Sequence, residues 1–389
     1  MQEENYFVKS EQIKGEGNTM VVLDVCLDNF YAFKNFHMNL TYPKKIVGSS
    51  IKEEHLAGRP NFRYKKVNII MGANASGKTT LGYMLMNIFN FLEKENYNSI
   101  TRAVGDSKKK ASFTLDMASG TNVFYRVACA VTPRKGEVYT PRDIRLEIRK
   151  ESILPGDSYE SCVKRIEAAA YSPEESYLDE LDKIEALDWM FVYPGDTGHV
   201  LRLPDKNEIF RSVLENILKS LDPAIRRVEM SRDVEKAYVI RLQDRSIILQ
   251  NGEQFDTKLL SSGTKAGVEV ARVVSSLIQD LRTFYCCDEK FPYIHSDIEK
   301  ALLSLMIEYV RPNAQLFFTT HNTDILDMSL PKHAFTFLRK DAEDAEHPIT
   351  CVSASALLKR STDSLRHAVE NDLFACAPAV DRIYAIENS

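Results

Sequence analysis

Alternation of apolar and polar residues predicts strands in the first half of the chain. Residues 20–27 and 36–42 follow this pattern, and we expect them to belong to the same sheet as a buried strand at 67–71. Three further stretches alternate in the same way and are separated by glycines or prolines: residues 112–116, 123–131 and 144–149. We expect these three to form an antiparallel layer beside the central sheet.

The spacing of apolar residues predicts helices in other regions of the chain. Behind the strand at 67–71, apolar side chains recur at this spacing: Leu81, Met84, Leu85, Ile88 and Phe91. Residues 207–221 form an amphipathic pattern that core packing explains. Residues 159–187 are helical and strongly acidic, which fits either a solvated helix or a docking surface for a partner. We predict one helical insertion lobe at 156–230, too short for a long coiled-coil arm, within a single domain that spans 1–389.

The second half of the chain adds strands and another helix. Residues 238–242 and 247–250 alternate as a strand pair, and Asn251-Gly252 is a turn signal. Apolar runs at 281–287 and 314–318 predict buried strands of a parallel sheet. Together these patterns predict an α/β fold with a mixed or parallel core sheet, an antiparallel β layer and a helical insertion.

Composition narrows the class of protein. The chain has 389 residues, and 44% of them are apolar, which is ample for a packed core. We expect a cytoplasmic protein with no membrane partner, because no run of eighteen apolar residues exists and residues 1–5 lack the features of a signal peptide. The seven cysteines form no C-x-x-C pair, which favours buried reduced thiols over disulfides or a zinc site.

Net charge bears on nucleic-acid binding. A value of −5 argues against a strongly basic nucleic-acid protein. The basic triplet at 108–110 fits a solvated loop, and contact with phosphates is the alternative, so nucleic acid stays open as a partner.

Residues 72–79 match the phosphate-binding motif G-x-x-x-x-G-K-[ST] in full: Gly72, Ala73, Asn74, Ala75, Ser76, Gly77, Lys78 and Thr79. The predicted strand and helix on either side are the context that the motif requires, and a chance match in a loop is the alternative. Glycines let backbone N–H groups turn toward phosphates, and the helix adds the positive end of its dipole. We expect Lys78 to reach the β- and γ-phosphates and the Thr79 hydroxyl to ligate Mg²⁺, with Thr80 also at the nucleotide.

Small residues at 260–264 precede a long helical pattern, and they include Ser261, Ser262 and Gly263. Such a helix N-terminus can bind an anion, although an ordinary capped helix explains the same residues. These three residues are therefore candidate nucleotide contacts.

Polar residues follow the two later parallel strands. Asp288 and Glu289 come after the strand at 281–287, at the strand end where ligands bind in open α/β sheets. We assign Asp288 to Mg²⁺, directly or through water, and Glu289 to orienting or deprotonating the attacking water. His321 follows the strand at 314–318 and is placed to donate a hydrogen bond to the γ-phosphate. Two solvated acids and a structural histidine are the alternatives.

In this order the motifs resemble those of ABC-type ATPase heads of the class that includes SMC, RecF and OLD-family proteins. The phosphate loop, a signature at 260–264, the Walker B pair Asp288 and Glu289 and the switch His321 match that class over roughly residues 20–340. Ser-Ser-Gly-Thr in the signature, His295 and the ending at 370–378 resemble compact bacterial heads related to AbiLi and to AriA of the PARIS phage-defence system. The resemblance implies ATP and Mg²⁺ as ligands, sandwiched between two copies of the chain with Ser261 and Gly263 acting in trans.

Three features depart from relatives of this class. No glutamine lies between Gln12 and Gln243, so the Q-loop role of ABC transporters is unassigned and coupling to a membrane transporter is not expected. Tyr31 stands where relatives place a basic side chain, which leaves that nucleotide contact open. About seventy residues follow His321, and we expect no Toprim nuclease domain of the OLD type among them.

The resemblance implies a slow ATPase that senses or gates in an intracellular anti-phage complex. It would act with a separate effector, expected to be a nuclease-like toxin, and with a phage trigger protein. One alternative is a DNA-repair ATPase of the RecF type, whose ATP-closed dimer clamps duplex DNA. Another is a scaffold that binds ATP and hardly hydrolyses it. A homodimer is expected, with higher homo-oligomers open.

Overall fold

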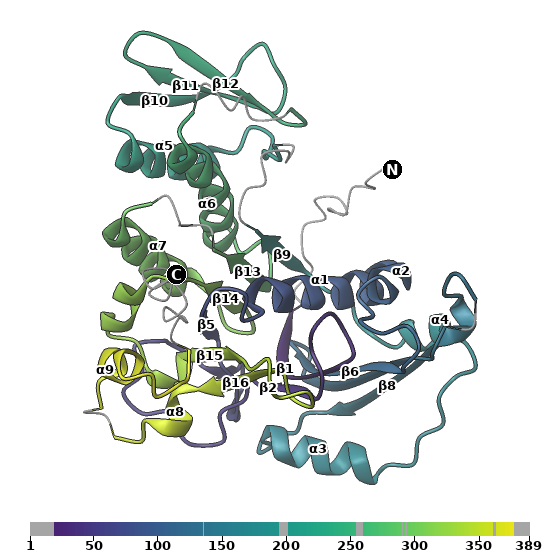
Figure 1. Ribbon diagram of the computed structural model, residues 1–389. Helices are drawn as coiled ribbons and strands as arrows, with labels where there is room; N and C mark the ends of the chain where they lie inside the picture. Colours follow the sequence, from purple (N-terminus) through teal and green to yellow (C-terminus); the bar gives the residue numbers. More distant parts are fainter. Residues whose placement is uncertain are drawn as a thin grey trace, which may run out of the picture.

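The computed structural model describes residues 19–134, 136–193, 201–253, 260–289, 291, 294–360 and 363–376. Residues 1–5, and Ala377 and Pro378 of the ending discussed above, lie outside the described residues. The described parts form two large sheets, a small lobe and the helices around them (Figure 1).

A six-stranded sheet at the centre carries the phosphate loop (Figure 1). Its strands lie in the order β16-β15-β5-β14-β13-β9: Ile349–Ser353, Phe335–Lys340, Val67–Met71, Gln315–Thr319, Phe284–Asp288 and Trp189–Val192. β16 is antiparallel to β15, and the other neighbouring strands are parallel. The buried strand predicted at 67–71 is confirmed with the same bounds, and the two later ones are confirmed with shifted bounds.

A five-stranded antiparallel sheet has the order β2-β1-β6-β7-β8: Phe36–Asn39, Met20–Asp28, Ala111–Ser119, Val123–Val131 and Ile144–Ser152. The antiparallel layer predicted for the last three is confirmed. The prediction that the first two strands join the sheet of the phosphate loop is wrong. β1 instead pairs with β6 along nearly its whole length. Both strands have nine residues, so this pairing lets nearly all of their facing backbone N–H and C=O groups form hydrogen bonds.

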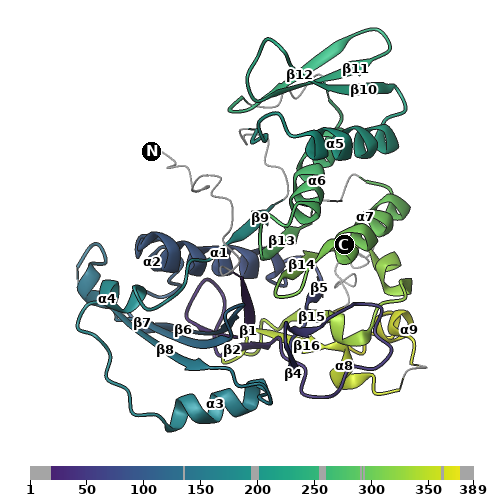
Figure 2. The ribbon, with the colours of Figure 1, turned by 180° about the vertical axis from the view of Figure 1, so that it is seen from behind.

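Helix α1 (Lys78–Lys94) lies between the two sheets (Figures 1 and 2). Its Leu85 belongs to one apolar cluster with Val127 of the five-stranded sheet and Phe317 of the central sheet. Phe318, the next residue of β14, points to the other face, where a second cluster packs against two helices: α6 (Ser262–Ile278) and α7 (Ser296–Tyr309). The central sheet is therefore covered on both faces, as mainly parallel sheets are.

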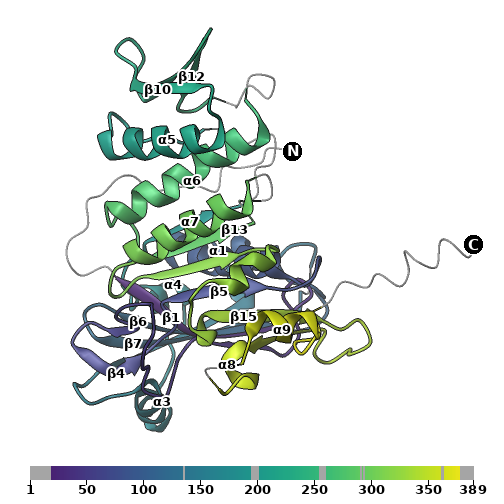
Figure 3. The same cartoon turned by 90° about the vertical axis from the view of Figure 1, so that its left-hand side faces the viewer.

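A small lobe stands at one end of the molecule (Figure 3). It contains α5 (Glu208–Leu221) and a three-stranded sheet of β10, β11 and β12: Ile225–Met230, Ala237–Leu242 and Ser246–Gln250. The amphipathic helix and the strand pair predicted here are confirmed. Asn207 caps the helix, because its side chain accepts a hydrogen bond of 2.8 Å from the amide of Phe210.

The helical insertion predicted at 156–230 does not form one unit. Helices α3 (Tyr159–Ala168) and α4 (Tyr177–Leu181) contact the five-stranded sheet, whereas β9 joins the central sheet and α5 lies in the lobe. The acidic stretch is not wholly solvated either. Glu180 is fully buried, and its carboxylate accepts hydrogen bonds from the amide of Ile148 (2.7 Å) and the ammonium of Lys183 (2.8 Å).

Short elements complete the described chain: α2 (Asn98–Thr101), β3 (His55–Leu56), β4 (Arg59–Arg63), α8 (Ala354–Leu357), α9 (Leu365–Glu370) and single helical turns at Pro141–Asp143, Thr323–Asp327 and Lys332–Ala334. Among the described residues, none of the helices combines the length and the apolar character that crossing a membrane requires.

Candidate functional site

Two positions in the loop between β5 and α1 have a backbone conformation that only glycine adopts without strain. Gly72 has φ +154°, and a Cβ there would lie 2.4 Å from the carbonyl oxygen of Leu338. Gly77, at the N-cap of α1, has φ +104°. The predicted strand, glycine loop and helix are thus confirmed, and they aim the N-terminus of α1 at the loop.

The ammonium of Lys78 lies over the phosphate loop. Its Nζ donates to the carbonyl oxygens of Gly72 (2.9 Å) and Ala73 (3.2 Å) and lies 3.4 Å from Oε1 of Glu289. Only 4% of Lys78 is exposed. Burial lowers the pKa of this ammonium, and the Glu289 carboxylate opposes the shift. A desolvated cation in this place is suited to a polyphosphate ligand.

The other residues of the motif line the same loop. Asn74 and Ala75 are exposed at its tip, and Thr80 is half-buried in the first turn of α1. Ser76 is buried, and its hydroxyl has no hydrogen-bond partner among the described residues. An unpartnered buried hydroxyl in this loop fits a segment that closes on an oxygen-rich ligand.

Asp288 and Thr79 bring two oxygen donors together at the carboxyl end of β13. The Thr79 hydroxyl donates to Oδ2 of Asp288 at 2.7 Å, and the Thr319 hydroxyl donates to Oδ1 at 2.5 Å. Asp288 is fully buried, and burial raises the pKa of its carboxyl while the two hydroxyls oppose this shift. A hydroxyl and a buried carboxylate fit Mg²⁺, which takes oxygen ligands and is commonly held by one or two carboxylates together with substrate phosphates.

Glu289 and His321 meet beside this pair. Their strands are parallel neighbours with Asp288 opposite Thr319, so both loops leave the sheet at one edge. The amide of Glu289 donates to the carbonyl oxygen (3.2 Å) and to the hydroxyl (3.0 Å) of Thr319, which fixes a backbone with φ +39°. Oε1 of Glu289 lies 2.7 Å from Nε2 of His321. The structure thus brings three sequence-distant segments of one chain together at one edge of the central sheet.

A buried network behind His321 was missed by the sequence analysis. Glu299 of α7 is 3% exposed, and its carboxylate accepts hydrogen bonds from the Thr320 hydroxyl and the Asn322 amide, both at 2.7 Å. Burial raises the pKa of Glu299, and these two donors oppose the shift. The sequence does contain a signal for this network: Glu299 lies three and four residues before Leu302 and Leu303, so its carboxylate is on the apolar side of the helix.

Two residues marked by the family resemblance lie outside this cluster. His295 caps α7, where Nδ1 accepts from the amide of Asp297 at 3.2 Å, and its side chain is exposed. The Tyr31 hydroxyl accepts a hydrogen bond of 2.9 Å from Asn87. The structure thus assigns local partners to both.

The signature segment caps α6, which was the alternative to the anion-binding helix start predicted for it. Oγ of Ser261 accepts from the amide of Thr264 at 3.1 Å, Ser261 and Ser262 are exposed, and Gly263 is half-exposed. Among the described residues, no hydrogen bond or ion pair joins 260–264 to the phosphate loop of the same chain. The exposed helix start is therefore free to face another molecule.

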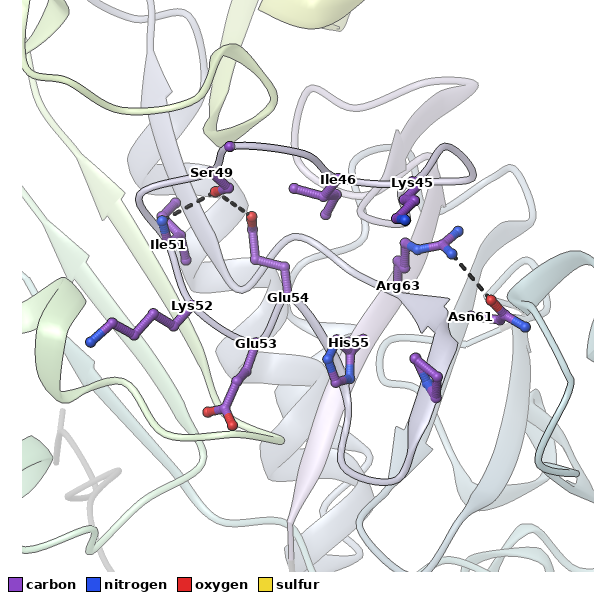
Figure 4. Close-up of a pocket in the computed structure, with 12 residues that line it drawn as sticks. Lys45, Ile46, Ser49, Ile51, Lys52, Glu53, Glu54, His55, Asn61 and Arg63 are labelled. Atoms are coloured by element: carbon purple, nitrogen blue, oxygen red, sulfur yellow. Dashed lines mark hydrogen bonds between the residues drawn. The ribbon is translucent and has the colours of Figure 1, made fainter.

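One cavity of the surface lies apart from the phosphate loop. A cavity of about 640 Å³ is lined by residues between Lys45 and Arg63 (Figure 4). Its wall includes Glu54, which accepts from the Ser49 hydroxyl at 2.6 Å and pairs with the buried His333 at 2.6 Å. This hollow contains none of the predicted site residues.

No protein-family model matches the chain, and no curated protein sequence matches it either. Solved structures do match. The chain is similar to an Smc head domain with an extended coiled coil bound to the C-terminal domain of ScpA from Pyrococcus furiosus (TM-score 0.51, 12% identity, 87% of this chain and 98% of that chain). It is also similar to an SmcHead bound to the C-winged helix domain of ScpA (TM-score 0.50, 15% identity, 87% and 99%). The chain thus shares the fold of these head domains, with the predicted mainly parallel core sheet and antiparallel β layer.

Proposed function

We propose that the protein is an ATPase that binds ATP with Mg²⁺ and hydrolyses it slowly. The convergence of Lys78, Thr79, Asp288, Glu289 and His321 at one edge of the central sheet carries this proposal. Lys78 and the amides of the loop bind the phosphates, and Thr79 and Asp288 hold the metal. When bound, Mg²⁺ neutralises charge that develops on the β- and γ-phosphate oxygens.

Glu289 and His321 supply the remaining steps. Glu289 orients a water for in-line attack and accepts its proton, and His321 donates a hydrogen bond to the γ-phosphate. Their mutual distance of 2.7 Å places base and donor on the same side of the phosphate loop. Release of the γ-phosphate then removes contacts that, in this proposal, hold two ATP-bound copies of the chain together.

A second copy of the chain completes the site in this proposal. Among the residues that the structure describes, the exposed start of α6 has no hydrogen bond or ion pair with its own phosphate loop, so Ser261 and Gly263 would contact the nucleotide of a partner molecule. Two ATP molecules would then join a homodimer, which is the arrangement that the motif resemblance implies.

Mixing two inactive variants tests both parts of the proposal. Lys78→Ala removes phosphate binding, and Ser261→Arg blocks the signature. Each variant alone should release little phosphate from ATP. A random dimer of equal amounts should recover about a quarter of the wild-type rate, because half of the dimers are mixed and each has one intact site. Activity of Lys78→Ala alone would exclude the assigned site, and failure of the mixture to recover would exclude action in trans.

We further propose that this ATPase gates an effector in a cytoplasmic anti-phage complex. The motifs at 260–264 and the resemblance to compact phage-defence heads support this role. Affinity purification from the native host should recover a separate effector protein, and deletion of the gene should raise phage sensitivity. If neither occurs and the protein instead shows ATP-dependent, salt-sensitive binding to duplex DNA, the DNA-repair alternative is favoured.

A further inference from the structure

A second cluster of metal-binding side chains lies on the five-stranded sheet, away from the nucleotide site. Asp24 and Cys26 are two residues apart on β1, and His37 lies opposite Cys26 on β2. All three side chains therefore leave the same face of the sheet. One oxygen, one sulfur and one nitrogen donor from these residues lie within 4.8 Å of one another.

The contacts within the cluster converge on one carboxylate. Nε2 of His37 lies 2.8 Å from Oδ2 of Asp24, and Sγ of Cys26 lies 3.6 Å from Oδ1. Tetrahedral zinc bonds of about 2.0–2.3 Å would separate neighbouring donors by about 3.3–3.6 Å. The sulfur–oxygen distance already fits this spacing, and the exposed His37 ring has room to move by the remaining half ångström or so.

Neighbouring residues hold the carboxylate in place. Nδ2 of Asn39 donates to Oδ2 of Asp24 at 2.8 Å, and the side-chain Oδ1 of Asn39 in turn accepts from the hydroxyl of Thr41 at 2.7 Å. Outer hydrogen bonds of this kind orient the ligands of metal sites.

Within the described part of the chain, the ion pairs of Asp24 differ from those of its neighbour Asp116. Asp116, opposite Asp24 on β6, has a bidentate partner in Arg126 at 2.7 and 2.8 Å. Among the described residues, Asp24 forms no ion pair with lysine or arginine, and it is only 8% exposed.

We propose that Asp24, Cys26 and His37 bind a divalent transition-metal ion, with Zn²⁺ as the best match. The mixed oxygen, sulfur and nitrogen set selects such an ion over Mg²⁺ or Ca²⁺. The exposed side of His37 leaves the fourth position to water or to a donor from another molecule. A sequence search for C-x-x-C pairs overlooks this site, because its ligands come one by one from two paired strands.

Metal binding to the full chain tests the proposal. The protein is stripped with a chelator and titrated with Zn²⁺ against a chromogenic competitor, and Co²⁺ is added separately to record thiolate-to-cobalt absorption. Wild type should bind one Zn²⁺ with a stoichiometric end point and show the cobalt–thiolate band. Cys26→Ser should lose the band, and His37→Gln, an exposed position, should weaken Zn²⁺ binding at least about tenfold.

Cys351→Ser is the matched control. Its Sγ lies 3.1 Å from the backbone oxygen of His37, so it is a neighbouring cysteine outside the proposed ligand set, and its variant should bind Zn²⁺ like wild type. The proposal is overturned if wild type shows no cobalt–thiolate band, if Cys26→Ser retains it, or if His37→Gln binds Zn²⁺ as tightly as wild type. Any of those results would show that the cluster is a histidine–aspartate ion pair and not a metal site.

Discussion

Replacing Glu289 by glutamine separates binding from hydrolysis. The change keeps the size of the side chain and an oxygen that can accept from His321, at 2.7 Å in the wild type. It removes the negative charge and the ability to take a proton from water. A general base contributes about 10²–10⁴-fold to rate, so phosphate release should fall by that factor, equivalent to about 2.7–5.4 kcal/mol in the barrier.

Binding of ATP should change in the opposite direction. Unit charges 3.4 Å apart, the Lys78–Glu289 separation, attract by about 1 kcal/mol at the dielectric constant of water and about 5 kcal/mol at an effective value of 20. The Glu289 side chain is 25% exposed, so solvent screening favours the lower figure. Removing this competitor frees the ammonium for phosphate and should tighten ATP binding by roughly fivefold.

Three quantities are measured for each variant: the rate of phosphate release, the affinity for ATP, and the oligomeric state by size-exclusion chromatography with ATP. Glu289→Gln should accumulate as an ATP-bound dimer. Glu308→Gln, the same chemical change at an exposed position of α7, should match wild type in all three measurements. A Glu289→Gln rate within about threefold of wild type would refute the role of this residue as base, since no lost general base leaves so small an effect.

Three further predictions concern buried charges. Glu299→Ala leaves the Thr320 hydroxyl and an Asn322 N–H without their acceptor, so the free energy of unfolding in urea should fall by about 2–4 kcal/mol and kcat should fall more than KM rises. Burial raises the pKa of Asp288, so Mg²⁺ affinity in the ATP complex should fall as pH is lowered through a range above that of an ordinary aspartate, and Asp288→Asn should abolish this dependence. Burial lowers the pKa of Lys65 from 10.5 to about 8. Since the unfolded chain binds more protons between these two values, stability should rise with pH across that window. Lys65→Met should remove this rise and add up to roughly 3 kcal/mol at pH 7.

The phosphate loop was predictable from sequence because its requirements are local. A buried strand, two glycines and an amphipathic helix are contiguous, and the structure places β5 at the predicted bounds and starts α1 at Lys78. The positions of Asp288 and His321 were predictable for a related reason, since both follow buried strands of one parallel sheet. The carboxyl ends of such strands share an edge whatever the intervening sequence.

Strand partners were not predictable, because alternation identifies a strand and not its neighbour. Residues 20–28 could pair with either sheet, and the choice depends on a partner at 111–119, more than eighty residues away. The four residues of β9 are too few to stand out within a helical stretch. The same limit hides Glu299 and the Asp24 cluster, whose function depends on partners that are distant in sequence.

The loop after β14 links the proposed chemistry to helix α9. At its start His321 contacts Glu289, and at its end Asp324 accepts from the guanidinium of Arg366 at 3.1 Å. Glu299 accepts two buried hydrogen bonds from this loop, one from Thr320 before His321 and one from Asn322 after it. Because these two contacts flank His321, any shift of His321 would have to break them, and buried contacts of this kind cost more to break than an exposed pair costs to rearrange. Glu299 is therefore the fixed point of a loop whose two ends contact Glu289 and Arg366.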